Sequence, residues 1–368
     1  MISLGGFANG YDTGSIGAML TMLQFNHSIG VLSPFYLGFM VSLVMLAAVI
    51  PSILSGYLAD SFGPLRIIAL GAALLGIGSL LDSTALNLGQ FIAGRAVAGL
   101  GSGVYLGNIS VYICEIAPFL ITVGICAGYF TCYRSVAIPS SLAWRLPLIV
   151  QCVVALCVRL KFPMGEAETN FLNSEQRPSM SEWRRALLLF TEAYRARTAL
   201  GLFVLGMIQL SGIDGVLYVI NHSTHRPDTA SFLASGLSGI LMLVVPIPAF
   251  LWADKWGRRT SAITGGAIDR SAVAKWVVVI GVFIFGMAYC ATWGIALAFF
   301  ANWLVAILTP ILLDQSSSGV YFLFGGVALV TVITLTMYMP DTRGRSLEDI
   351  QSAFRQPSFR SAMLDDLA

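Results

Sequence analysis

The chain has 368 residues, of which 57% are apolar and only 11% charged, and its formal net charge is +2. An ordinary soluble domain carries about 25% charged and 45–50% apolar residues, and a soluble fold of this size could not hide so much apolar surface. The composition therefore predicts an integral membrane protein, and the small net charge implies no basic surface for nucleic acid. The six Cys lie in apolar runs without CxxC spacing, which indicates core packing rather than disulfides or a metal site.

Apolar stretches long enough to cross a bilayer follow one another along the chain. A helix needs about 20 mostly apolar residues to span the hydrocarbon, and the alternating pattern of barrel strands is not seen. We therefore expect an all-α fold with eleven candidate spans. They cover 2–22, 33–58, 65–86, 89–113, 119–138, 146–162, 198–220, 229–252, 276–294, 295–313 and 319–339.

Charged residues gather in three blocks, 159–197, 253–275 and 340–368, which hold 16 of the 21 Lys and Arg. The positive-inside rule places all three blocks on the cytoplasmic side. The sequence thus predicts four parts in order. These are an N-terminal bundle of six spans over 1–162, a cytoplasmic linker over 163–197, a C-terminal bundle over 198–339 and a cytoplasmic tail over 340–368.

A short motif occurs once in each half of the chain. Ala59-Asp60-Ser61-Phe62-Gly63 returns as Ala253-Asp254-Lys255-Trp256-Gly257, and arginines follow each copy: Arg66 in the first half, Arg258 and Arg259 in the second. An internal repeat in a membrane protein indicates a transporter whose substrate lies between the halves. Asp and Arg in such loops can pair and latch the cytoplasmic side of one conformation. A plain positively charged turn is the alternative.

Six motifs in the right order resemble the sugar porter family of the major facilitator superfamily, and its fungal members most. They are Gly10-Tyr11-Asp12-Thr13-Gly14, Gly94-Arg95 with Gly99, Gly101 and Gly103, Tyr112 to Pro118, Gln209-Leu-Ser-Gly-Ile-Asp214, Asp254 to Arg259, and Pro340 to Ser346. The resemblance covers nearly the whole chain. It implies the major facilitator fold, with twelve spans in two six-helix bundles that rock about a central site for a hexose-type sugar.

Asp12 and Arg95 each lie inside an apolar span, where a charge costs about 2.5–3.5 kcal/mol and needs a partner or an aqueous cavity. In proton-coupled members of the family, the aspartate of this motif pairs with the arginine of the fourth span. The resemblance therefore implies that this pair couples sugar movement to a proton, because moving the two apart changes the carboxylate's affinity for protons. A static salt bridge that holds the bundle together is the alternative.

Sugar hydroxyls require groups that both donate and accept hydrogen bonds, together with aromatic faces for the ring. The seventh span offers four such residues: Gln209, Ser211, Asp214 and Tyr218. Trp293 and the Asn302-Trp303 pair match aromatic and amide positions of the tenth and eleventh spans of the family. An interhelical hydrogen bond for Gln209 and an interfacial position for the tryptophans are the alternatives.

Glu115, in the Glu115-Ile-Ala-Pro118 motif at the cytoplasmic end of the fourth span, is expected to join the latch with Arg66 or Arg259. A solvated helix end is the alternative. Pro64 and Leu65 stand where the family usually has basic residues, so we expect the N-terminal half of the latch to be weak.

The chain also departs from the family. Between Gly266 and Ala274 the ninth span is missing, and further segments are absent after Pro118, near Pro163 and after Gly294. Eleven spans that start inside would put the Arg-rich tail outside, against the positive-inside rule. We expect 276–313 to form a bent or re-entrant element, and the losses resemble skipped coding segments of a splice variant or a faulty gene model.

The sequence thus predicts secondary transport of a monosaccharide, with a proton, across a fungal plasma membrane. An uncoupled facilitator, a sugar sensor that does not transport, and an inactive truncated product are the alternatives. We expect no enzymatic activity, because no nucleophile–base pair or phosphate loop occurs, and no cofactor or metal. Partners are the sugar, the proton and the lipid bilayer. The sequence indicates neither the particular sugar nor the oligomeric state.

Overall fold

The structure is a computed structural model that describes residues 4–30, 32–112, 117–160, 195–210, 240, 295–309, 311–312 and 317–338. The described part is helical and contains no strand. Its helices are α1 (Leu4–Leu20), α2 (Leu23–Ile29), α3 (Pro34–Phe62), α4 (Pro64–Ser83), α5 (Leu88–Tyr112), α6 (Ala117–Ser135), α7 (Leu142–Leu160), α10 (Arg195–Leu210), an unlabelled helix Ile295–Thr309, and α16 (Ser317–Tyr338).

The helices expected in the first half of the chain are confirmed. The six spans expected between residues 2 and 162 correspond to α1 and α3 to α7, with ends that agree within four residues. Those expected at 198–220, 295–313 and 319–339 correspond in part to α10, Ile295–Thr309 and α16. The spans expected at 229–252 (apart from residue 240) and 276–294 lie outside the described residues, as do the tail and nearly all of the linker.

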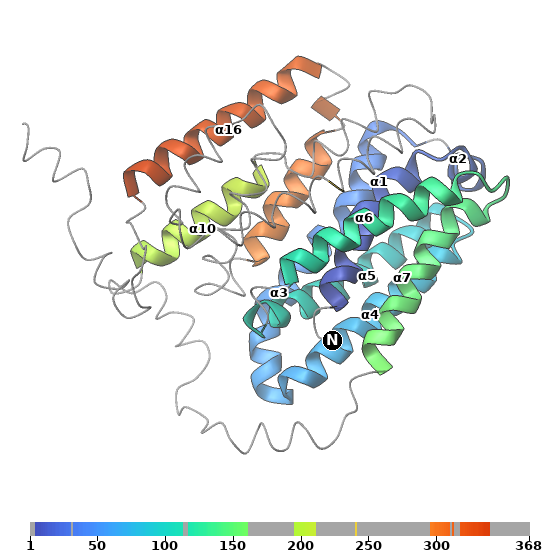
Figure 1. Cartoon of the computed structure of the whole chain (residues 1–368), viewed down its shortest axis with the longest axis horizontal. Coiled ribbons are helices and arrows are strands. Elements are labelled where there is room, and N and C mark those ends of the chain that lie inside the picture. The colour runs from blue at the N-terminus through green and yellow to red at the C-terminus, as the bar shows by residue number, and fades with distance from the viewer. Residues whose placement is uncertain are drawn as a thin grey trace, which may run out of the picture.

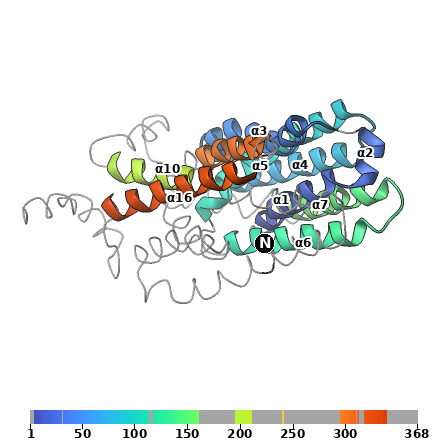
Figure 2. The same ribbon diagram turned by 90° about the horizontal axis from the view of Figure 1, so that it is seen from above.

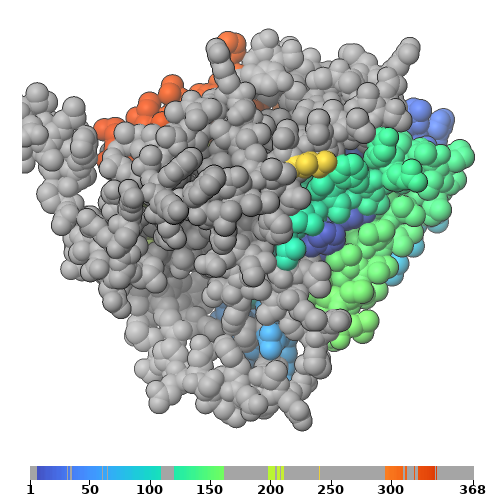
Figure 3. Space-filling model, viewed as in Figure 1, coloured from blue at the N-terminus to red at the C-terminus, as the bar shows by residue number. Residues whose placement is uncertain are grey.

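Three helices of the described part are long and apolar enough to cross a membrane on their own composition. Their apolar segments are Phe35–Ala59, Leu65–Ser83 and Leu142–Leu160. The last of these, in α7, divides cleanly into two faces. Trp144, Leu148 and Gln151 are buried, whereas Ile149 and Val153 are exposed. The exposed face is apolar, as expected of a helix in contact with lipid, and α6 and α7 (green) form part of the outer surface in Figure 3.

The helices of the first half pack side by side in one bundle (Figures 1 and 2). α4 packs against α5 and α7, α3 against α5, and α1 against α6. Glycines permit the last contact. A Cβ on Gly10 or Gly14 of α1 would collide with the backbone of Ile121 or Ile125 of α6. Small residues are the usual way for membrane helices to approach closely, and here they hold the α1 motif in place.

An aromatic cluster fills the end of this bundle at which α2 lies. The fully buried Trp144 meets Phe25 edge to face, with ring centroids 5.4 Å apart, and Phe91 completes the cluster. The indole Nε1 of Trp144 donates to Ser28 Oγ at 3.2 Å. The Arg145 guanidinium lies 4.7 Å from the centroid of the Trp144 ring. These contacts fix α2, α5 and α7 to one another.

The second half touches the first along α3. Ile295 and Phe299 of the helix Ile295–Thr309 pack against Ala48 in one apolar cluster. Further along, a Cβ on Gly38 would lie 3.1 Å from the carbonyl oxygen of Ala306. α10 and α16 lie on the side of this helix away from the N-terminal bundle (Figure 1).

Candidate functional site

Asp12 and Arg95 form a buried ion pair between α1 and α5. Arg95 Nη1 donates to Asp12 Oδ1 at 2.7 Å, and Arg95 Nη2 donates to Asp12 Oδ2 at 3.0 Å. Asp12 is 5% exposed and Arg95 1% exposed. The two parallel hydrogen bonds are the geometry in which guanidinium and carboxylate bind each other most strongly. The structure thus brings together the two residues that the sequence predicted to be partners.

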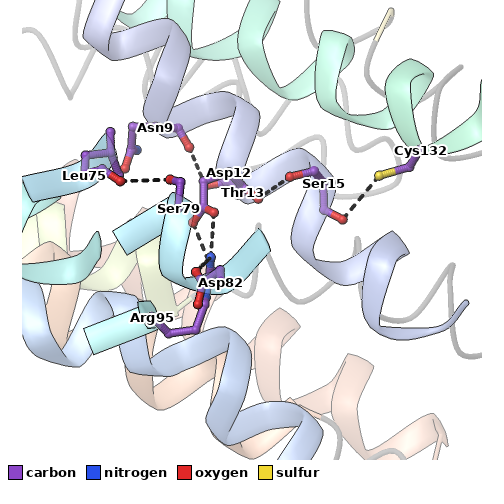
Figure 4. A network of polar contacts seen from close by, with 9 residues as sticks. All are labelled: Asn9, Asp12, Thr13, Ser15, Leu75, Ser79, Asp82, Arg95 and Cys132. Atoms are coloured by element: carbon purple, nitrogen blue, oxygen red, sulfur yellow. Dashed lines mark hydrogen bonds and ion pairs between the residues drawn. The ribbon is translucent and has the colours of Figure 1, made fainter. Parts of the chain in front are cut away.

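The position of Asp12 follows from the glycines around it. Gly10 and Gly14 place one face of α1 against α6. Asp12, two residues from each, projects away from that face toward α4 and α5, as Figure 4 shows. Ser15 Oγ donates to the Asp12 carbonyl oxygen at 3.3 Å, and Thr13 Oγ1 bonds within the same helix. The motif thus provides both the close helix contact and the buried charge.

A second carboxylate, which the sequence reasoning missed, lies in the same place. Asp82 sits in the last turn of α4, and its Oδ2 is 3.8 Å from Arg95 Nη1. Asp82 is 0% exposed, and neither of its carboxylate oxygens has a hydrogen-bond partner in the described part of the chain. One signal was available: Asp82 is a charge inside the apolar stretch 65–86, the same criterion that singled out Asp12.

Gly94 makes room for this second carboxylate. It precedes Arg95 on α5, and a Cβ built on it would overlap Asp82 Oδ1 and lie 2.9 Å from Asp82 Cγ. The two adjacent residues Gly94 and Arg95 therefore have different roles at this site. Gly94 lets the end of α4 approach α5, and Arg95 supplies the positive charge that the two carboxylates face (Figure 4).

Three of the expected sugar-binding residues are described: Gln209, Asn302 and Trp303, whose buried indole Nε1 has no hydrogen-bond partner among the described residues. Gln209 lies in the last turn of α10, half-buried, with a buried Oε1 that has no hydrogen-bond partner among the described residues. Asn302 is 8% exposed, and its Nδ2 donates to Met45 Sδ of α3 at 3.7 Å, which places it where the two halves meet. Four others lie outside the described residues: Ser211, Asp214, Tyr218 and Trp293.

The latch is described only at its first turn. α3 ends at Phe62, Gly63 follows with a φ of 90°, and α4 begins at Pro64. Asp60 lies in the last turn of α3, although its side chain is outside the description, and Arg66 is exposed in the first turn of α4. The remaining latch candidates lie outside the described residues: Glu115, Asp254, Arg258 and Arg259. The pairing within the latch stays a prediction.

The arrangement of helices is similar to solved structures of the Escherichia coli xylose transporter XylE. Its partially occluded, inward-open structure superposes with a TM-score of 0.70 at 20% sequence identity, covering 94% of this chain and 98% of that chain. The structure of the proton:xylose symporter XylE bound to 6-bromo-6-deoxy-D-glucose gives a TM-score of 0.70 at 17% identity. The fold is therefore that of the major facilitator superfamily transporters, as expected.

The chain itself belongs to the sugar transporter family. The sequence profile of that family, "Sugar (and other) transporter", matches residues 1–164, 163–298 and 286–354. The glucose transporter GlcP of Staphylococcus epidermidis is 26% identical over 434 residues, covering 96% of each chain. The arabinose-proton symporter of Bacillus subtilis is 24% identical over 95% of this chain and 92% of its own. Relatives occur in bacteria, yeast and plants, and they include proteins named as sugar transporters as well as a yeast protein named as a glucose sensor.

Proposed function

We propose that this protein carries a monosaccharide across a membrane together with a proton, by alternating access between two helix bundles. The observation that carries the proposal is the bidentate Asp12–Arg95 pair, buried between α1 and α5 in a chain of the sugar transporter family. A buried pair that closes in one conformation and opens in another changes its affinity for a proton, and thereby links proton movement to the rocking of the bundles.

Sugar recognition is assigned to two amides of the second half, Gln209 on α10 and Asn302, of which Asn302 lies at the junction of the halves. Among the described residues, the buried Oε1 of Gln209 has no hydrogen-bond partner, so it can accept a hydrogen bond from a sugar hydroxyl, and Asn302 lies against α3. Support for a sugar as substrate comes from the glucose and arabinose transporters to which the chain is similar. The plasma membrane of a fungus is the location we propose, from the resemblance of the motifs.

A sugar sensor is the second candidate. The high glucose sensor RGT2 of Saccharomyces cerevisiae is 24% identical over 96% of this chain, although the match covers only 60% of the sensor. Sensor and transporter differ in one measurable property, since a sensor binds sugar without moving it.

We further propose that the chain lacks internal segments of the family, including the ninth span. The alignment with GlcP runs over 434 positions, whereas 96% of 368 residues is about 353, so about 80 aligned positions have no residue here. The family profile also matches in three separate stretches, with junctions near residue 163 and near Gly294, two of the places where we expected losses.

The test of the proposed function is sugar uptake into vesicles that contain the purified protein, with and without an imposed pH gradient. We expect uphill accumulation of a monosaccharide when the outside is acidic. Asp12→Asn should abolish accumulation and leave sugar exchange largely intact. Thr13→Ala is the matched control, because in the described part of the chain Thr13 Oγ1 donates only to the Asn9 carbonyl oxygen of its own helix. Concentration of sugar by Asp12→Asn would exclude the coupling role, uptake without pH dependence would indicate a facilitator, and binding without uptake would indicate a sensor.

A further inference from the structure

We propose that Asp82 is a second proton-binding group of the site, and that it holds its proton at neutral pH while Arg95 is hydrogen-bonded to the Asp12 carboxylate. The juxtaposition that suggests it is a carboxylate in the last turn of α4 facing an arginine of α5 that already has a carboxylate partner from α1 (Figure 4).

Arg95 makes much closer contacts with the Asp12 carboxylate than with that of Asp82. Asp12 accepts from both Nη atoms of Arg95, at 2.7 and 3.0 Å, whereas Asp82 Oδ2 lies 3.8 Å from Arg95 Nη1. Both carboxylate oxygens of Asp82 are buried without a hydrogen-bond partner in the described part. A buried ionised carboxylate without hydrogen bonds is far more costly than a neutral one. The carboxyl group of Asp82 is therefore the member of the pair that carries a proton.

The count of charges leads to the same result. One guanidinium faces two carboxylates, so the cluster would carry a charge of −1 if both were ionised and is neutral if one is protonated. Two carboxylates in one buried site share a proton for this reason. The last turn of α4 adds to the effect, because the carbonyl end of a helix disfavours a negative charge.

Other charged groups around Asp82 do not supply a second counter-ion in the described part. On α7 the nearest is Arg145, whose Nη2 donates to the carbonyl oxygen of Ala85 at 3.0 Å and whose guanidinium stacks on Trp144. α3 also packs on α4, but it carries no charged residue from Pro34 to Ala59, and its titratable tyrosines, Tyr36 and Tyr57, are about half exposed. In the described part of the chain, Asp12 from α1 and Arg95 from α5 are thus the charges that face Asp82.

Two carboxyl groups thus compete for one arginine. When the O–H bond of Asp82 breaks, Asp82 takes the place of Asp12 at Arg95, and the proton passes to the Asp12 carboxylate. The cluster keeps the same number of protons and the same charge before and after this exchange. The inference deepens the proposed proton coupling and rests on it for any role in transport, but the proton on Asp82 can be detected without transport.

The test is infrared spectroscopy of the purified full chain at about pH 7, well above the ordinary carboxyl range of about 4. Wild-type protein should show the C=O stretch of a protonated carboxyl that shifts in D₂O. It should shift again when aspartate is labelled with ¹³C at the side-chain carboxyl, which distinguishes Asp from Glu without any substitution. The absence of a protonated aspartate signal would overturn the proposal.

Three variants locate the proton. Asp82→Asn, which has nearly the shape of the neutral acid, should remove the signal. Asp12→Asn should also remove it, because Asp82 then ionises to pair with Arg95. Ser79→Ala is the matched control and should keep the signal, since among the described residues Ser79 Oγ donates only to the Leu75 carbonyl oxygen one turn earlier in α4. A signal that survives Asp82→Asn would place the proton elsewhere, and one that survives Asp12→Asn would exclude the competition.

Vesicle uptake separates the two proposals. If Asp82 gives the infrared signal but sugar uptake does not depend on pH, the proton on Asp82 is supported and proton-coupled transport is excluded. If a pH gradient drives sugar accumulation but the infrared signal is absent, proton-coupled transport is supported and the proton on Asp82 is excluded.

Discussion

Asp12 and Asp82 differ in how much of their environment is visible in the sequence. Asp12 stands in a recognisable motif at the centre of an apolar stretch, and its partner could be predicted from the resemblance to a family. Asp82 stands near the end of a stretch, where a charged residue usually meets water. Its burial depends on α5, which covers the end of α4 through the glycine at position 94. That contact joins residues of two helices, and no local pattern reports it.

Gly94→Ala should destabilise the protein by about 1–3 kcal/mol, the usual cost of inserting a methyl group into a filled space. The new Cβ would overlap the Asp82 carboxyl group. Gly89→Ala is the matched control on the same helix, because a Cβ there meets only Asn87 Oδ1 at 3.5 Å. Thermal unfolding in detergent measures both variants. Equal unfolding temperatures for the two would contradict the close contact between α4 and α5.

Gln209→Ala should weaken sugar binding by about 1–3 kcal/mol, the cost of leaving a buried hydroxyl of the sugar unpaired. Gln209 Oε1 is buried and has no partner in the described part of the chain, so truncating it removes no hydrogen bond that is seen there. Isothermal titration with a monosaccharide gives the affinity, and thermal unfolding of the same samples gives the stability. Unchanged affinity with a lowered unfolding temperature would show that Gln209 is an interhelical contact instead.

At the scale of the helices, the sequence predicted the first half well and the second half less completely. Spans over 2–162 were found within four residues because each is a long apolar run bounded by Gly, Pro or polar residues. The short helix α2 (Leu23–Ile29) was not predicted, since seven residues contain too little pattern. Its place is determined by tertiary contacts: Phe25 fills the aromatic cluster with Phe91 and Trp144.

Trp144→Ala should therefore destabilise the N-terminal bundle by about 3–5 kcal/mol, as expected when a large, fully buried aromatic side chain is removed. Trp144→Phe should cost less, because a ring remains for Phe25 although the hydrogen bond to Ser28 Oγ is lost. Unfolding temperatures in detergent rank the variants. If the alanine variant unfolds like the wild type, the cluster does not hold α2 and α7 together.

At the scale of the whole molecule, the charges of the second half pose a question of topology. The Lys- and Arg-rich block 253–275 and the tail after Pro340 should both lie inside, yet three candidate spans stand between them. One of the three must fail to cross. The weakest candidate is 295–313, which contains Asn302 and Pro310 and ends at Asp314.

We therefore expect the 368-residue chain to transport sugar slightly or not at all, and a version with the missing segments restored at Pro118, Gly266 and Gly294 to transport it well. Uptake into a transporter-deficient strain compares the two forms. A tag placed after Ala368 reports the side of the tail through its accessibility in intact cells. Robust saturable uptake by the unmodified chain at the plasma membrane would refute this expectation.

The contact of α3 with the helix Ile295–Thr309 has a mechanical consequence. Gly38, Met45 and Ala48 meet Ala306, Asn302 and Phe299 in antiparallel order, over about three turns, so the two helices touch along a line rather than at a point. Gly38 lets the two backbones approach closely at one end of this line, and Met45 and Ala48 supply side-chain contacts along the rest of it. We expect tilting of this helix against the N-terminal bundle to pivot about this line, so that distances far from it change the most.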